Sequence, residues 1–447
     1  MKDFRPGYHY RPRENWINDP CGLIQHRGVY HLFHQYNPYE DRWGHMHWGH
    51  ATSNDMVHWK QQDIALKPDI ENGETHCFTG CGGHLPDGRP VFYYTSISDR
   101  RPPEQWHAFA QDASLHTLVQ TSKDAMDLSM HLPLQDISEW RDPSVLPYEN
   151  GYLMALGCRL KNRGACLLYT SEDGLGFTYH SVLAMADGDE DYSWECPNLM
   201  RLGDKYVLMY SPYRQPKYIV GTLQKDLRFI PEAKGVVDCG GQEGYYAPQS
   251  FRDAQNRQLI LGWMTERSRG DWDGIHGWAG CMSLPREAYL EGNVLKMRVI
   301  PEIEKLVAST ERGMLPLLRC DAGEQYRLIL EVQLEVGGCV RVELLATPEG
   351  EEKTVVMLYG NGRLLLDRGA SSQYPTHHGL LERRLNLPHG RARLEIYVDH
   401  STIEVGGNDE WISSRVYPSR EDATGLSVRL QNGGGSYALS QMNDCEK

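Results

Sequence analysis

Short apolar or aromatic runs alternate with tight polar turns through the first three hundred residues, a pattern typical of β-strands. Five of these runs follow similar turns, at Gly28, Gly88, Gly151, Asp204 and Asn256. The turns are spaced by 60, 63, 53 and 52 residues. Four short strands with their loops fit that period, so the pattern predicts a β-propeller of five blades. An irregular all-β domain with hairpins that recur by chance is the alternative.

Acidic residues precede three of these turns by nine positions each, namely Asp19, Asp142 and Glu195, and a proline closely follows each one. Equivalent positions on the innermost strands of a propeller converge on its axis, so we expect three carboxylates in one funnel. Crowded carboxylates resist simultaneous ionisation, and one of them tends to keep its proton near neutral pH. Retaining glycoside cleavage needs such an acid beside an ionised carboxylate. The alternative is that each residue only caps its turn.

A second domain is indicated after the propeller pattern ends. Residues 301–306 look like a short helical connector, and period-two alternation returns at residues 326–332 and 392–398. Short strands separated by glycine-rich turns predict a β-sandwich. We therefore expect an all-β chain with a five-bladed catalytic β-propeller over residues 1–302, a connector over 303–311 and a C-terminal β-sandwich over 312–447. The sandwich carries no acid pair that looks catalytic, and a stabilising or oligomer-forming role is expected for it.

Charge and cysteine usage narrow the class of protein. The chain has 447 residues and a net charge of −14, which argues against nucleic acid or an anionic membrane surface as partner but not against a neutral sugar. Its 11 cysteines are an odd number without the spacing of a disulfide framework. The first residues contain no apolar signal-peptide core, and no apolar run is long enough for a membrane helix. A reduced, cytoplasmic protein is the expectation.

The same segments resemble the invertase and fructanase family, glycoside hydrolase family 32. The resemblance begins in residues 15–20 around Asp19 and continues through residues 33–38, 47–50 and 78–80. It includes an arginine-aspartate-proline motif at residues 141–143 and an acid/base motif at residues 194–197. Later segments follow in the family's order, at residues 246–251, 262–264, 277–280, 284–287, 399–405 and 414–418. The similarity thus extends over nearly the whole chain.

By this resemblance, Asp19 is the nucleophile that attacks the anomeric carbon of fructose. Glu195 is the acid/base, which protonates the leaving oxygen and then deprotonates the attacking water. Asp142 stabilises the transition state through the fructose hydroxyls, and a retaining pair should have carboxyl groups roughly 5 to 5.5 Å apart. The expected substrate-binding residues are Asn18, Gln35, Trp43, Phe78, Thr79, Arg141 and Trp263.

Two departures from the family pattern stand out. Cys21 replaces the second asparagine of the opening motif, which alters a polar contact near the nucleophile, and Gly406 and Gly407 replace bulkier sandwich residues. The histidines His45 and His47 alternate along one strand, which a metal site could use, and His50 lies nearby. The proposed chemistry needs no metal, so we expect neither a metal nor a cofactor.

The function expected is that of a retaining β-fructofuranosidase acting on sucrose, sucrose 6-phosphate or short fructo-oligosaccharides. A phosphate pocket would need basic residues at the funnel rim, and the candidates are Arg159, Lys161, Arg163, Arg267 and Arg269. Fructosyl transfer by the same residues is an alternative, and a non-catalytic sugar-binding propeller is another. The expected partner is a small fructoside, and neither nucleic acid nor a membrane is expected. The sequence leaves open three points: a homo-oligomer through the sandwich, the leaving group and the linkage preference.

Overall fold

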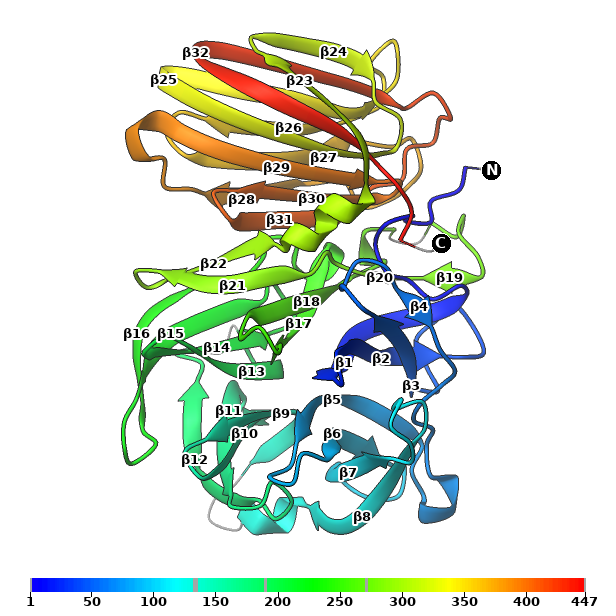
Figure 1. The fold of residues 1–447 in the computed structure, drawn as a ribbon, viewed down its shortest axis with the longest axis vertical. Coiled ribbons are helices and arrows are strands. Elements are labelled where there is room, and N and C mark those ends of the chain that lie inside the picture. Colours follow the sequence, from blue (N-terminus) through cyan, green and yellow to red (C-terminus); the bar gives the residue numbers. More distant parts are fainter. Residues whose placement is uncertain (1, 132–135, 189–190, 270–271, 446–447) are drawn as a thin grey trace.

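The computed structural model describes residues 2–131, 136–188, 191–269 and 272–445. Strands dominate both halves of the chain, and the helical elements among the described residues are short 3-10 turns. A five-bladed propeller forms the lower body in Figure 1, and the yellow-to-red strands of the β-sandwich lie above it. The predicted fold class is confirmed. No helix in the described ranges is long and apolar enough to cross a membrane.

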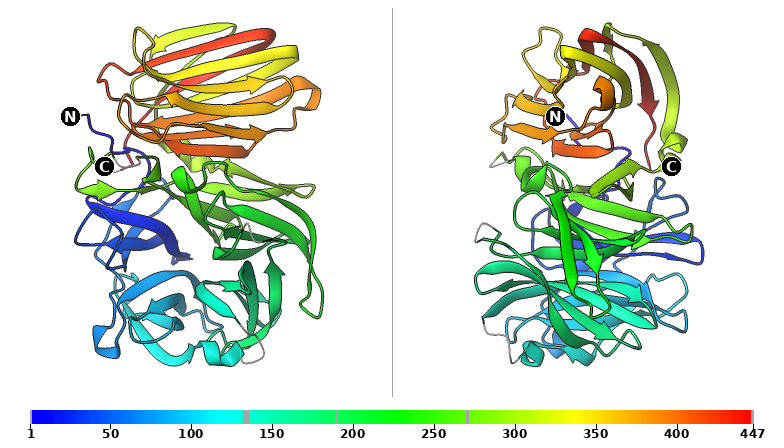
Figure 2. Two further views of the ribbon diagram at one scale, coloured as in Figure 1. Left: turned by 180° about the vertical axis from the view of Figure 1, so that it is seen from behind. Right: turned by 90° about the vertical axis from the view of Figure 1, so that its left-hand side faces the viewer.

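Each blade is a sheet of antiparallel neighbours in chain order around the ring (Figures 1 and 2). Blade 1 contains β1 (Asn15–His26), β2 (Val29–Asn37), β3 (His47–Ser53) and β4 (Lys60–Gln61). Blade 2 contains β5 (His76–His84), β6 (Pro90–Ile97), β7 (Glu104–Ala110) and β8 (Leu118–Met126). Blade 3 contains β9 (Ile137–Tyr148), β10 (Gly151–Leu160), β11 (Arg163–Ser171) and β12 (Thr178–Met185).

The last two blades complete the ring. Blade 4 contains β13 (Glu195–Leu202), β14 (Lys205–Ser211), β15 (Lys217–Leu223) and β16 (Phe229–Val236). Blade 5 contains β17 (Tyr245–Arg252), β18 (Gln258–Met264), β20 (Cys281–Met282), β21 (Arg286–Glu291) and β22 (Val294–Val299). The short strand β19 (Trp278–Ala279) pairs in parallel with the start of β1, so late residues close the ring onto the first blade. The 3-10 turns of the propeller are η1 (Ile70–Asn72), η2 (Leu128–His131), η3 (Gly241–Glu243) and η4 (Arg267–Arg269).

All five turns of the sequence repeat join the first two strands of a blade, at β1–β2, β5–β6, β9–β10, β13–β14 and β17–β18. The strands read as apolar runs because both faces of an inner strand are covered by neighbouring blades. Every residue of β2 after Val29, for example, is buried. Between blades 1 and 2, Phe33, Trp48 and Phe92 pack in one aromatic cluster. Packing between blades therefore fixes where the inner strands lie around the axis.

The inner strand of every blade has a register shift at the same height, between Ile17 and Pro20 in β1 and between Glu195 and Asn198 in β13, for example. The corresponding shifts lie in β5, β9 and β17. A bulge bends its strand and re-aims side chains out of the pleat. The predicted shared register of the three acids is approximate, because Glu195 is the last paired residue before its bulge, whereas Asp19 and Asp142 lie within theirs.

The sandwich follows a 3-10 turn, η5 (Pro301–Leu306), and its first strand begins at Val307. Ten strands form one hydrogen-bonded network that folds over an aliphatic core. They are β23 (Val307–Met314), β24 (Leu317–Asp321), β25 (Gln325–Ala346), β26 (Lys353–Tyr359), β27 (Arg363–Ala370), β28 (Leu380–Arg384), β29 (Arg391–Asp399), β30 (Thr402–Gly407), β31 (Glu410–Arg415) and β32 (Gly425–Met442), with η6 (Pro388–Gly390) before β29. The strands β29 to β31 face the propeller (Figure 1).

Candidate active site

A pocket of about 550 Å³ lies where the inner strands of the propeller converge. Its polar floor comes from the bulged segments of β1, β5, β9 and β13, because each bulge turns a polar side chain toward the axis. Every residue expected from the sequence lines it: Asn18, Asp19, Gln35, Trp43, Phe78, Thr79, Arg141, Asp142, Glu195 and Trp263. Residues from seven separate chain segments thus meet in one place.

Asp19 is half-buried at the floor of this pocket. The hydroxyl of Thr79 donates a hydrogen bond of 2.7 Å to its Oδ2, and the Cys196 thiol lies 3.5 Å from the same oxygen. Burial raises the pKa of the Asp19 carboxyl, and the negative charge of Glu195 adds to that effect, while the bond from Thr79 opposes it. One carboxylate oxygen is thereby fixed in place by neutral donors. A nucleophile needs this combination of a fixed position and little direct charge compensation.

Asp142 occupies a backbone position with φ of 67°, inside the β9 bulge. Its Oδ2 accepts a hydrogen bond of 2.9 Å from the Cys196 backbone N–H, and the Arg141 Nε lies 3.9 Å away. Burial raises the pKa of Asp142 to about 7; Arg141 opposes the shift, and the charges of Glu195 and Asp19 add to it. The direction of this shift agrees with the expectation that crowded carboxylates resist simultaneous ionisation.

Glu195 is held on both carboxylate oxygens. The Arg141 Nη2 donates to Oε1 at 2.9 Å, and the Tyr246 hydroxyl donates to Oε2 at 2.6 Å. Tyr246 also accepts a hydrogen bond of 2.9 Å from the Tyr213 backbone N–H, which ties blade 4 to blade 5. These contacts fix the carboxyl group toward the pocket, where it can exchange a proton with a bound substrate.

Five further pocket or contact residues had no role in the sequence-based assignment. They are Trp16, Glu139, Cys196, Tyr213 and Tyr246. Tyr246 is the last paired residue before the β17 bulge, as Glu195 is before the β13 bulge, whereas the nine-residue spacing points to its neighbour Ala247. The side chains of Tyr246 and Glu195 consequently meet at the axis. The contacts of Tyr213 depend on a loop between strands, for which the repeat gives no register.

Aromatic rings form the walls of the pocket. Trp16 packs edge-on against Trp263 with ring centroids 5.6 Å apart, and its indole N–H donates to the Asn18 side chain at 2.8 Å. On the other side Trp43 meets Phe78 edge-on at 6.1 Å. Trp43 is 55% exposed, so its ring stands at the pocket mouth, whereas Trp263 is buried. Flat rings around a polar floor suit a sugar, whose faces are apolar and whose edges carry hydroxyls.

Cys21 lies directly behind the nucleophile and is fully buried. Its thiol donates to the backbone carbonyl of Asp19 at 3.4 Å, and the Gln35 amide lies 3.8 Å from its sulfur. Gln35 also donates to the Cys77 carbonyl at 2.9 Å. The thiol therefore supports the main chain of Asp19.

Metal-ligating side chains do not gather in the described part of the chain, where no group of three or more His, Cys, Asp or Glu residues could hold an ion. The histidine segment has other contacts instead. His47 bonds through Nδ1 with the backbone carbonyl of His45, and His50 stacks on Phe33 with centroids 4.3 Å apart. These histidines serve packing in blade 1.

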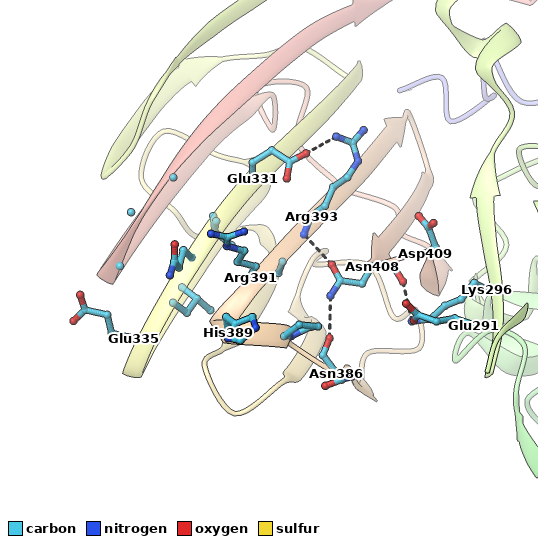
Figure 3. A pocket seen from close by; sticks show the side chains of 18 of the residues that line it. Glu291, Lys296, Glu331, Glu335, Asn386, His389, Arg391, Arg393, Asn408 and Asp409 are labelled. Atoms are coloured by element: carbon cyan, nitrogen blue, oxygen red, sulfur yellow. Dashed lines mark hydrogen bonds and ion pairs between the residues drawn. The ribbon is translucent and has the colours of Figure 1, made fainter. Parts of the chain in front are cut away.

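A larger cleft, of about 1090 Å³, lies between β21–β22 of the propeller and the sandwich (Figure 3). Several of its charged and amide side chains bond to one another or to the backbone. Arg393 binds Glu331 at 2.6 Å, and its backbone N–H donates to Asn408 at 2.9 Å. Asn408 in turn donates to the Asn386 carbonyl at 2.9 Å. The converging carboxylates are in the smaller pocket, which makes that pocket the candidate active site.

Known proteins share both the sequence and the architecture. The model of the glycosyl hydrolases family 32 N-terminal domain matches residues 9–300, and the family 32 C-terminal model matches residues 297–443. The chain belongs to glycoside hydrolase family 32. The resemblance inferred from the sequence motifs is therefore confirmed.

Individual family 32 proteins align over nearly the full length of this chain. A sucrose-6-phosphate hydrolase of Escherichia coli is 32% identical over 96% of this chain and 92% of its own. Among solved structures, a Bombyx mori β-fructofuranosidase variant in complex with sucrose has a TM-score of 0.81 at 25% identity, covering 99% of this chain and 95% of its own. Fructan 1-exohydrolase IIa from Cichorium intybus has a TM-score of 0.86 at 23% identity, covering 99% and 98%, which supports the fold.

Proposed function

We propose that this family 32 chain is a retaining β-fructofuranosidase that hydrolyses terminal β-fructofuranosyl residues of small fructosides. The observation that carries the proposal is the convergence of Asp19, Asp142 and Glu195 in one aromatic-walled pocket. Relatives named as a sucrose-6-phosphate hydrolase and as a β-fructofuranosidase bound to sucrose support the substrate class. The 11 free cysteines support a reducing compartment such as the cytoplasm.

In the proposed reaction, Asp19 attacks the anomeric carbon of the fructosyl unit and forms a covalent intermediate. Glu195 donates a proton to the departing oxygen and then takes one from the water that resolves the intermediate. Asp142 accepts hydrogen bonds from fructose hydroxyls as positive charge develops on the ring. Arg141 positions both Asp142 and Glu195, because its guanidinium lies within 4.0 Å of each carboxylate. Asn18, Gln35, Thr79, Trp43, Phe78 and Trp263 bind and enclose the sugar.

The direct test is fructose release by the purified wild type from sucrose, sucrose 6-phosphate, a kestose mixture, inulin and levan in parallel. We expect release from at least one small fructoside and none by Glu195→Gln. Absence of release from all five by folded wild-type protein would overturn the proposal. Retention is tested separately in buffer containing methanol, where the methyl fructoside formed should have the β configuration; the α product would exclude the covalent intermediate.

Transfer and hydrolysis share the same covalent intermediate, so both activities follow from the same residues. Product analysis at high sucrose concentration separates them. We expect free fructose to exceed transfer products. A predominance of trisaccharides would assign this family 32 member to fructosyl transfer instead.

A further inference from the structure

The cationic side chains that line the catalytic pocket differ in whether carboxylates neutralise their charge. Two cationic side chains are among its lining residues, Arg141 and Arg267. Arg141 is neutralised, because its guanidinium binds Glu139 at 3.2 Å and Glu195 at 2.9 Å. Arg267 is exposed, and among the described residues no carboxylate lies within the 4.0 Å of an ion pair. Its guanidinium donates to the neutral side-chain carbonyl of Gln242.

A rigid platform presents Arg267 to the pocket. The residue begins η4, directly after Thr265 and Glu266, both of which are buried. Thr265 donates to the Gln242 carbonyl at 2.6 Å, and Glu266 accepts hydrogen bonds from the Gly280 backbone N–H at 2.9 Å and from Arg415 at 2.7 Å. The backbone under Arg267 is thus fixed from three directions, while its charged end stays in solvent.

Arg267 lines the same pocket as Glu195 and is linked through Gln242 to the segment that supports Glu195. Its partner Gln242 belongs to η3, which leads directly into β17, and β17 carries the Tyr246 hydroxyl that holds Glu195. A group that protonates the departing oxygen must face the leaving sugar. The exposed Arg267 is therefore available to that sugar, whereas Asp19 and Asp142 on the floor bind the fructosyl unit.

The charge balance of the pocket points to an anionic leaving group. Asp19, Asp142, Glu195 and Glu139 make the pocket acidic, and such a field repels a phosphorylated substrate. Arg267, which has no carboxylate partner among the described residues, offsets that repulsion only at its own position. The forked guanidinium of arginine matches a phosphate monoester with two parallel hydrogen bonds. A neutral leaving sugar gains far less from the same group.

We propose that Arg267 binds the phosphate monoester of a phosphorylated leaving sugar and sets the preference of this site for phosphorylated over neutral β-fructosides. The inference rests on the proposed function and adds to it the residue that selects the leaving group. It makes Arg267 a specificity-determining residue, with no part in bond cleavage itself.

A second arginine on the propeller, Arg159, provides the matched control. Arg159 on β10 stacks over the Tyr192 ring at 5.5 Å, donates to Asn162 at 2.7 Å and lines a separate cavity with Lys161. Like Arg267, it has no carboxylate within ion-pair distance among the residues described. It does not line the catalytic pocket. The two arginines thus compare the same charge inside and outside the site.

The experiment measures kcat/KM for sucrose 6-phosphate and for sucrose with the wild type, Arg267→Gln, Arg267→Lys and Arg159→Gln. We expect a preference of the wild type for the phosphorylated substrate, and a fall in that preference of roughly tenfold or more in Arg267→Gln, because a charge-assisted hydrogen bond is lost. Arg267→Lys should retain part of the preference, and Arg159→Gln should keep it within about twofold. An unchanged ratio in Arg267→Gln, or a loss confined to Arg159→Gln, would overturn the inference.

Product inhibition gives an independent readout. Glucose 6-phosphate should inhibit sucrose cleavage by the wild type more strongly than glucose does, and this difference should disappear in Arg267→Gln. Equal inhibition by the two sugars in the wild type would count against a phosphate contact. Wild-type protein that cleaves neither substrate would refute the proposed function, whereas cleavage of sucrose without preference for its phosphate would refute the role of Arg267 alone.

Discussion

Two clusters of carboxylates in this molecule contain similar residues, but the pKa values of their carboxyl groups shift in opposite directions. The funnel holds Asp19, Asp142 and Glu195 around one arginine. The interface between propeller and sandwich holds three more, Asp238, Asp399 and Glu404. In the first cluster the pKa values of Asp19 and Asp142 are raised, and in the second the pKa values of Asp399 and Glu404 are lowered. Burial is common to both, so burial alone does not explain the difference.

The interface cluster has a full set of donors. Arg286 binds both Glu404 and Asp238, and His9 lies 2.8 Å from Asp399 and 2.9 Å from Glu404. Although burial acts in the other direction, the Arg286 charge and the bond from His9 bring the pKa of Glu404 down to about 2. In the funnel a single arginine serves the acids. A reactive carboxyl group is therefore one whose neighbours leave its charge partly uncompensated.

Among the substitutions that test this comparison, those of the funnel carboxylates should have the largest effect, and the effect should be on turnover. Asp19→Asn and Glu195→Gln should each lower kcat on sucrose by at least about a thousandfold, because each removes a group that makes or breaks a bond. Circular dichroism and the melting temperature should stay close to wild type. Asp87→Asn, on the exposed β5–β6 turn, is the control. Variants of Asp19 or Glu195 that retain wild-type rates would remove these assignments.

The interface cluster should respond in stability. Glu404→Ala leaves Arg286, His9 and the Leu284 backbone N–H without their buried acceptor, so we expect a loss of about 3 to 5 kcal/mol. Denaturant unfolding checks this figure. Glu382→Ala breaks a solvent-exposed ion pair with Arg363 and should lose far less stability, because water screens the pair. Similar losses in the two variants would mean that the interface charges contribute no more than surface ones.

The pH dependence of stability sharpens the contrast. The pKa of Asp142 is raised to about 7 in the folded protein, so its contribution is complete below the unfolded value of about 4 and is lost as pH rises through 7. Relative to wild type, Asp142→Asn should therefore gain stability between about pH 4 and 8, on the order of a few kcal/mol. Melting curves of both proteins over this range test it. Parallel curves would show that Asp142 ionises normally.

The lowered pKa of Glu404 predicts the opposite trend. Its contribution is present above the unfolded value of about 4.5 and is lost as pH falls through about 2. In the same melting experiments, the deficit of Glu404→Ala should stay constant above about pH 5 and shrink toward lower pH. A deficit that grows on acidification would contradict the charge pairing at the interface.

The smallest effect is expected at Cys21. Its thiol bonds to the Asp19 backbone carbonyl, a contact that a serine hydroxyl can also make, so Cys21→Ser should change kcat/KM by less than about tenfold. Burial also raises the pKa of this thiol, which makes thiolate scarce. Iodoacetamide at about pH 8 should leave the folded wild type active. Rapid inactivation that Cys21→Ser prevents would show that the thiol is accessible.

The repeat in the sequence was sufficient to predict the blades, and the acid spacing was sufficient to find the pocket. The turns at Gly28 and Gly151 join inner strands because tight hairpins depend on local residue types. Contacts between blades were beyond this reasoning, as with the Tyr246 hydroxyl on Glu195, 51 positions away. The interface cluster could not be predicted from the sequence for the same reason, because His9 and Asp399 are 390 positions apart. Periodicity describes one element at a time, and these contacts depend on how elements pack.

The N-terminal segment has a consequence for the timing of folding. Gly7, Tyr8 and His9 donate backbone hydrogen bonds to Asp399, and Asn15 pairs with Trp278 to close the ring. Gly7 leaves the ribosome 392 residues before Asp399 does, an interval of roughly 20 to 80 s at ordinary rates of synthesis. Until Trp278 is made, 263 residues after Asn15, the edge of blade 1 has no partner strand there, and other chains can join it. The growing chain is thus most prone to aggregate while it is incomplete, and its first residues reach their final places only after nearly all the others have been made.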